Sequence, residues 1–212
     1  MEAYRSGRLV YIPIAKNASS TYKYVFHEAL GWDETTCDQI DWHQDKVFGH
    51  YQHPYRRHTK GLAEAMYRYG FQDLVNDTRL RRLMATAVFD VHSYPIVPTL
   101  GHDWAYKIDW ILMDHPCCKT HVAASVDVLT NKFLKYHGVN IDVTHYKRKY
   151  TSSQQKLALE RQLVKIRDEW DPEDTLTHFY DRDVVLWNTL NDQTYFWNDT
   201  WNQISRIYHE LS

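Results

Sequence analysis

Apolar and polar positions along the chain follow two different periods, which predicts a mixture of strands and helices. Residues 9–12 form a short run of β-branched and aromatic side chains, and Pro13 interrupts this run. From Ser19 to Leu30 the apolar side chains recur at the three- and four-residue spacing of a helix face. This first stretch therefore predicts a strand, a connecting loop and a helix.

The same order of strand and helix recurs twice more. Residues 47–51 predict a second strand, and the helical pattern that begins near Tyr55 ends at Gly70, a residue typical of helix C-caps. Residues 107–114 predict a buried strand, which is followed by a helix over 122–137. Further helices are predicted over 73–87, over 152–170, from 173 onward and over 195–211.

Strands that alternate with helices predict an α/β fold with a central parallel sheet flanked by helices. No internal repeat, low-complexity tract or linker interrupts the 212 residues. We therefore expect a single domain over 1–212, in which 192–212 form a C-terminal helical extension.

The charge balance and hydropathy exclude two classes of partner. The 25 Lys and Arg residues against 27 Asp and Glu residues give no overall basic field, so no nucleic acid partner is expected. No run approaches the ~18 consecutive apolar residues that a membrane span needs, and no signal-peptide core follows the first residues. We expect a cytoplasmic protein with no membrane partner. The 3 cysteines match no zinc spacing, and no metal is expected.

The first loop carries the residues of a candidate anion site: Lys16, Asn17, Ala18, Ser19, Ser20 and Thr21. A lysine and three hydroxyls here precede or begin a helix, where free backbone N–H groups and the helix dipole favour a phosphate or sulfate. The glycines of a Walker A loop are missing, which weakens a kinase or ATPase interpretation.

The order of Pro13, Lys16, small residues and hydroxyls entering a helix resembles the 5′-phosphosulfate loop of sulfotransferases that use 3′-phosphoadenosine 5′-phosphosulfate (PAPS). In that family Pro and Lys are more often adjacent. The resemblance implies a three-layer, P-loop-like nucleotide-binding fold and PAPS as cofactor, with adenosine 3′,5′-bisphosphate as product. It also implies that Lys16 stabilises the leaving phosphate.

A second segment, 52–60, is similar to the R-D-P-x-x-R-x-x-S element with which the family holds the 3′-phosphate. Pro54 and Arg57 match that pattern, whereas Gln52 and Lys60 stand where the family has its phosphate-binding arginine and serine. The resemblance implies Gln52, Arg57 and Lys60 as cofactor-binding residues.

Three later features extend the resemblance to the Golgi-type carbohydrate sulfotransferases. The segment 90–95 keeps the histidine and proline of the family's N-x-H-W-x-P motif, which makes His92 a candidate general base. His43 is a second candidate, because it lies between the two cofactor elements. Lys147 and Arg148 stand where a family loop closes over the nucleotide, and Tyr180 belongs to a helix similar to the Y-x-x-D-x-x-L-F helix.

The sequence thus predicts a PAPS-dependent sulfotransferase whose acceptor is a hydroxyl. Aromatic residues make up 15% of the chain and suit a carbohydrate acceptor, because sugars pack on Trp and Tyr faces. Aryl alcohols and protein tyrosine remain open. Three alternatives also remain: a catalytically inactive relative that binds a nucleotide or glycan, a P-loop-like kinase, and a plain interaction domain.

Overall fold

A five-stranded mixed sheet forms the centre of the computed structural model, which describes residues 1–86, 92–113, 126–146, 153–169 and 173–191. Its strands lie in the order β3 (Asp33–Thr36), β1 (Glu2–Ser6), β2 (Leu9–Tyr11), β4 (Lys46–Tyr51) and β5 (Asp109–Leu112). β2, β4 and β5 are mutually parallel, whereas β1 runs antiparallel to both β2 and β3.

The three strands expected from the sequence are confirmed as β2, β4 and β5. The sheet is not parallel throughout, because the sequence analysis missed β1 and β3. β1 joins β2 through a tight hairpin in which Ser6 pairs with Leu9, and Gly7 adopts a φ of 58° in the turn. Glycine takes this left-handed conformation without steric cost, so Gly7 was a readable turn signal.

The described helices are α1 (Ser19–Lys23), continued by the π-helix η1 (Tyr24–Ala29), α2 (Pro54–Tyr69), α3 (Thr78–Thr86), α4 (Ile96–Leu100), α5 (His102–Ala105), α7 (Val126–Tyr136), α8 (Gln154–Asp168) and α9 (Glu173–Asn191). They include those expected near Ser19, Tyr55, 122–137, 152–170 and 173 onward, together with two short helices, α4 and α5, that the sequence analysis missed. Short 3₁₀ turns cover Cys37–Gln39, Gln72–Asn76 and Val143–Tyr146. The helix expected over 73–87 is therefore divided, and the extension over 192–212 lies outside the described residues.

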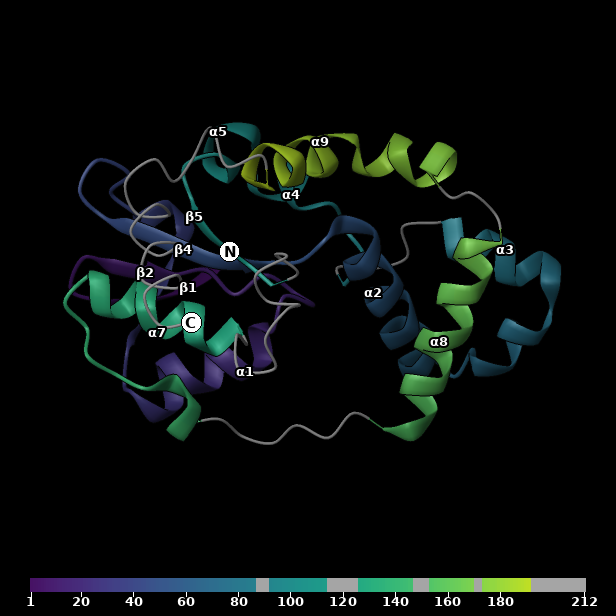
Figure 1. Ribbon diagram of the computed structural model, residues 1–212, viewed down its shortest axis with the longest axis horizontal. Helices are drawn as coiled ribbons and strands as arrows, with labels where there is room; N and C mark the ends of the chain where they lie inside the picture. Colours follow the sequence, from purple (N-terminus) through teal and green to yellow (C-terminus); the bar gives the residue numbers. More distant parts are fainter. Residues whose placement is uncertain (87–91, 114–125, 147–152, 170–172, 192–212) are drawn as a thin grey trace, which may run out of the picture.

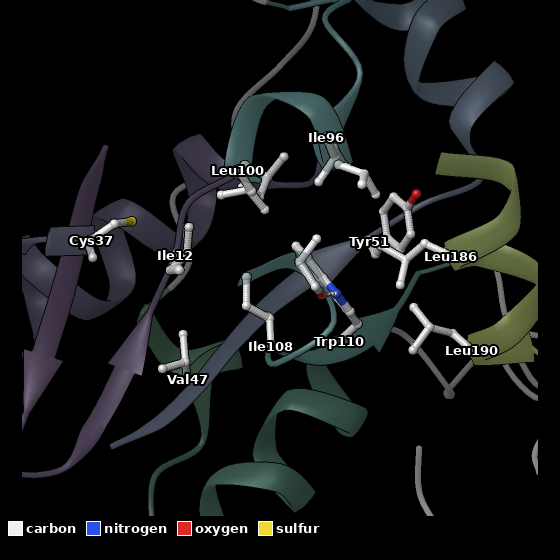
Figure 2. Close-up of a cluster of buried hydrophobic side chains, with 14 of the residues drawn as sticks. Ile12, Cys37, Val47, Tyr51, Ile96, Leu100, Ile108, Trp110, Leu186 and Leu190 are labelled. Carbon is white, nitrogen blue, oxygen red and sulfur yellow. Dashed lines mark hydrogen bonds between the residues drawn. The ribbon is translucent and has the colours of Figure 1, made fainter. Parts of the chain in front are cut away.

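Helices cover both faces of the sheet. Figure 1 shows α1 and α7 below the sheet and α4, α5 and α9 above it. Alternate positions of β2 point to opposite sides, so that Tyr11 packs with the α1 and α7 layer while Val10 packs with the α4 and α9 layer. Figure 2 shows Ile96 of α4, Leu186 of α9 and Trp110 of β5 in the apolar cluster that contains Val10.

Helix α2 links the sheet to a third apolar cluster. It follows β4 directly, with Pro54 in its first turn, and ends at Gly70, whose φ is 73°. Leu62 and Met66 pack against Leu163 of α8, so α8 lies along α2. The first turns of α2 thereby remain beside the sheet, at the carboxyl end of β4.

Within the described residues, none of the helices combines the length and the apolar character that crossing a membrane requires.

Replacing Gly61 of α2 by alanine is expected to destabilise the fold. A Cβ at this position would lie 2.2 Å from the carbonyl oxygen of His92, a backbone atom that cannot rotate away. We expect Gly61→Ala to lower the free energy of unfolding by about 1–3 kcal/mol, although alanine is the better helix former by about 1 kcal/mol. Urea denaturation measures the change.

Gly70→Ala is the control, because no atom lies within 4 Å of its Cβ position and only the backbone conformation opposes it. An unchanged or raised stability of Gly61→Ala would show that the segment around His92 does not lie against α2.

Candidate anion-binding site

The loop between β2 and α1 has an unusual backbone for a segment without glycine. Lys16 and Ala18 have positive φ values of 62° and 58°, whereas Asn17 and Ser19 do not. A non-glycine residue in this left-handed region costs roughly 1–2 kcal/mol, and such residues concentrate at functional sites. The alternation of backbone conformation turns successive N–H groups toward one side, which is the geometry of an anion-binding nest.

The backbone N–H groups that precede the first hydrogen bonds of α1 are open to a ligand. Ala18 is the N-cap and provides no side-chain cap, while its carbonyl oxygen accepts from the N–H groups of Thr21 and Tyr22. In the part of the chain that the structure describes, no partner accepts from the backbone N–H of Ala18, Ser19 or Ser20. These three donors can therefore hold the oxygen atoms of a phosphate or sulfate.

Hydrogen bonds from the end of β4 hold the loop in this shape. The backbone N–H of Gln52 donates to Asn17 Oδ1 (3.1 Å), and the Gln52 side-chain Nε2 donates to the carbonyl oxygen of Lys16 (2.8 Å). Asn17 is fully buried, yet its Nδ2 has no partner within the described residues. A buried donor without an acceptor is costly, which marks this loop as incomplete by itself.

The side chain of Lys16 contacts a carboxylate that the sequence analysis did not single out. Lys16 Nζ lies 2.9 Å from Glu64 Oε2, and Lys156 Nζ lies 3.0 Å from the same oxygen. Arg68 Nε lies 2.6 Å from Glu64 Oε1. Glu64 thus joins the loop to α2 and α8, and its three cationic neighbours leave an excess of positive charge beside the loop.

This cluster changes the pKa of two of its members. Burial alone would raise the pKa of Glu64, but the hydrogen bonds from Lys16, Arg68 and Lys156 outweigh burial and hold the pKa well below 4.5. Burial lowers the pKa of Lys16 from its ordinary value, and the hydrogen bond to Glu64 opposes that change. An anion in the loop would compete with Glu64 for the Lys16 ammonium.

Two further predicted cofactor residues lie on α2, close to the loop. Lys60 Nζ donates to Gln52 Oε1 (2.9 Å), so this ammonium stands next to the residue that shapes the loop. Arg57 is buried, and its Nε donates to the carbonyl oxygen of Ala15 (2.9 Å). The structure therefore brings Lys16, Asn17, Gln52, Arg57 and Lys60 together.

The two candidate bases lie in different places. The backbone of His92 touches Gly61 of α2, on the helix that carries Lys60. His43 is exposed and lies in the turn before β4, at the amino end of that strand. The loop lies at the carboxyl ends of the parallel strands, about 20 Å along the sheet, so the geometry gives His43 no support as a base at this site.

Lys147 and Arg148, expected at a closing loop, lie outside the described residues. The described part of the chain contains no group of three or more His, Cys, Asp or Glu side chains that could hold a metal ion.

Comparisons with known proteins leave the family of this chain open. No protein-family model matches it, and neither the curated proteins nor the solved structures contain a match. The function must therefore be inferred from the site.

The Glu64 cluster predicts a specific loss of stability in acid. Because the folded-state pKa of Glu64 is lowered, its stabilising contribution is complete above the unfolded value near 4.5 and disappears as the pH falls toward the folded value. Between about pH 6 and about pH 3, the wild type should therefore lose more stability than Glu64→Gln. Urea denaturation at each pH measures both proteins.

Glu34→Gln is the control, because Glu34 is an exposed glutamate of β3 outside the cluster. Parallel pH profiles of the wild type and Glu64→Gln would show that Glu64 is not held ionised by its neighbours.

Proposed function

We propose that this chain is a PAPS-dependent sulfotransferase, in which the loop from Lys16 to Thr21 holds the 5′-phosphosulfate. The observation that carries the proposal is a set of backbone N–H groups, those of Ala18, Ser19 and Ser20, that have no acceptor among the described residues and lie in the loop that carries Lys16. The loop follows β2 at the carboxyl edge of the parallel strands, where α/β proteins bind nucleotides. A P-loop-like fold belongs to this proposal.

The residues of the loop suit a tetrahedral anion. The nest presents backbone N–H donors, and Ser19, Ser20 and Thr21 add three hydroxyl groups. The Lys16 ammonium adds a positive charge when it leaves its ion pair with Glu64 and binds the ligand instead. PAPS supplies the sulfuryl group, which passes to an acceptor oxygen as the bond to the 5′-phosphate breaks and a base takes the hydroxyl proton. His92 is the base that we favour.

A catalytically inactive nucleotide-binding relative is the second candidate. It is favoured by the position of Arg57, whose guanidinium donates to backbone carbonyls, and by the neutral Gln52 at a family phosphate position. The carbohydrate acceptor and the cytoplasmic location remain predictions from the sequence.

Adenosine 3′,5′-bisphosphate should stabilise the chain, whereas ATP with Mg²⁺ should not. A ligand at ~100 times its dissociation constant stabilises a fold by ~2.7 kcal/mol, which a thermal shift detects. We expect Lys16→Ala to remove this stabilisation and to abolish sulfate transfer from PAPS, because the loop then lacks its only charged side chain.

Lys135→Ala is the charge-matched control, since Lys135 is exposed in the last turn of α7. Bisphosphate binding without transfer in the wild type would support the inactive relative. Stabilisation by ATP with Mg²⁺ alone would support the kinase, and no response to either ligand would overturn nucleotide binding.

Replacing Lys60 should affect binding of the 3′-phosphate but not of the 5′-phosphate. Its ammonium lies beside Gln52 rather than at the nest, so we expect Lys60→Ala to weaken the bisphosphate by about tenfold and to change adenosine 5′-phosphate little. Calorimetric titration of both nucleotides measures the two effects. Equal losses for both ligands would exclude Lys60 from the 3′-phosphate site.

A further inference from the structure

A cavity of about 330 Å³ lies beside the residues that lead into the anion loop. Its walls come from the loop, from the start of α2 and from the segment that contains α4. The apolar side chains that line it include Pro13, Ile14, Ala15, Pro95, Ile96 and Leu100. Ile96 and Leu100 belong to the apolar cluster that contains Val10 and Trp110, and Figure 2 shows both on α4. This cavity is therefore part of a packed, preformed region of the fold.

One charged side chain, that of Arg57, lines this apolar cavity. Arg57 is only 3% exposed. Its Nε donates to the carbonyl oxygen of Ala15 (2.9 Å), and its Nη1 donates to the carbonyl oxygen of Tyr94. No described residue accepts from Arg57 Nη2, although a guanidinium carries five N–H donors.

The positive charge of Arg57 also has no direct counterion among the described residues. Asp183 is the carboxylate whose field reaches it, but the two oxygens of Asp183 accept from the backbone N–H groups of Ile96 (2.7 Å) and Val97 (2.8 Å). Asp183 therefore caps α4 instead of forming an ion pair with Arg57. Buried charges in folded proteins are normally paired, because desolvation of a lone charge is costly.

We propose that this cavity binds a small monocarboxylate with an apolar body. The ligand carboxylate accepts from Arg57 Nη2 and supplies the missing counterion, while the aliphatic or aromatic body packs against Ile14, Ile96 and Leu100. The volume lies at the lower end of the ~300–1,000 Å³ typical of small-molecule sites, which suits a short chain or a single ring. The site uses neither Lys16 nor the nest, so it goes beyond the proposed function.

Octanoate is the probe, and 1-octanol is its neutral counterpart with the same chain length. We expect the full-length chain to bind octanoate at least about tenfold more tightly in calorimetric titrations, because a hydrogen bond to a charged group is worth about 1.5–3 kcal/mol. Equal affinities for both compounds would overturn the role of Arg57. Binding of neither compound would overturn the site itself.

Thr99→Phe tests the location without removing Arg57. Thr99 lines the cavity yet is exposed, and its hydroxyl only donates locally to the carbonyl oxygen of Pro95. The added ring should obstruct the cavity and weaken octanoate binding by at least about tenfold, with an unchanged melting temperature. Undiminished binding to Thr99→Phe would place the octanoate site elsewhere.

Arg57→Lys is a second test. It keeps the positive charge but removes the planar guanidinium, whose N–H groups donate both to the two carbonyl oxygens and to the ligand. It should also bind octanoate more weakly. Lys16→Ala should bind octanoate like the wild type but should no longer bind adenosine 3′,5′-bisphosphate. The two proposed sites can therefore fail independently of each other. Loss of octanoate binding in Lys16→Ala would contradict the independence of the two sites.

Discussion

The candidate site depends on Gln52, whose polar groups form hydrogen bonds to the loop and to α2. Its backbone N–H binds Asn17, its side-chain Nε2 binds the Lys16 carbonyl oxygen, and its Oε1 accepts from Lys60. Gln52 is 1% exposed, so water does not compete for these bonds. They hold the loop against the cost of two residues with positive φ. A neutral amide therefore shapes the loop.

Two cations next to the loop, the half-buried Lys16 and the buried Arg57, differ in the partners that the fold gives to their charges. Lys16 has a counterion in Glu64, which Arg68 and Lys156 also contact, so binding of an anion requires an exchange of partners. Among the described residues, Arg57 has only carbonyl oxygens as direct partners. The first arrangement favours a ligand with enough negative charge to displace a carboxylate, whereas the second favours any small carboxylate that reaches the cavity.

The topology of the sheet explains why the predicted residues meet at one edge. β2 and β4 are adjacent and parallel, so the loop after β2 and the start of α2 after β4 emerge side by side. The turn that carries His43 precedes β4 and therefore lies at the opposite edge. β1 and β3 extend the sheet beyond β2 with antiparallel pairing and bring no predicted site residue to that edge.

The sequence by itself determined the local elements around the site. β-branched and aromatic runs predicted β2 and β4, Pro54 and Gly70 marked the ends of α2, and residues 16–21 marked the loop of the candidate site. Only the tertiary structure decided the pairing of Lys16 with Glu64, since this ion pair joins residues far apart in the chain. It also decided the burial of Arg57 beside a cavity. Periodicity and capping act within a few residues, whereas counterions, cavities and strand pairing depend on contacts that form only when distant segments pack together.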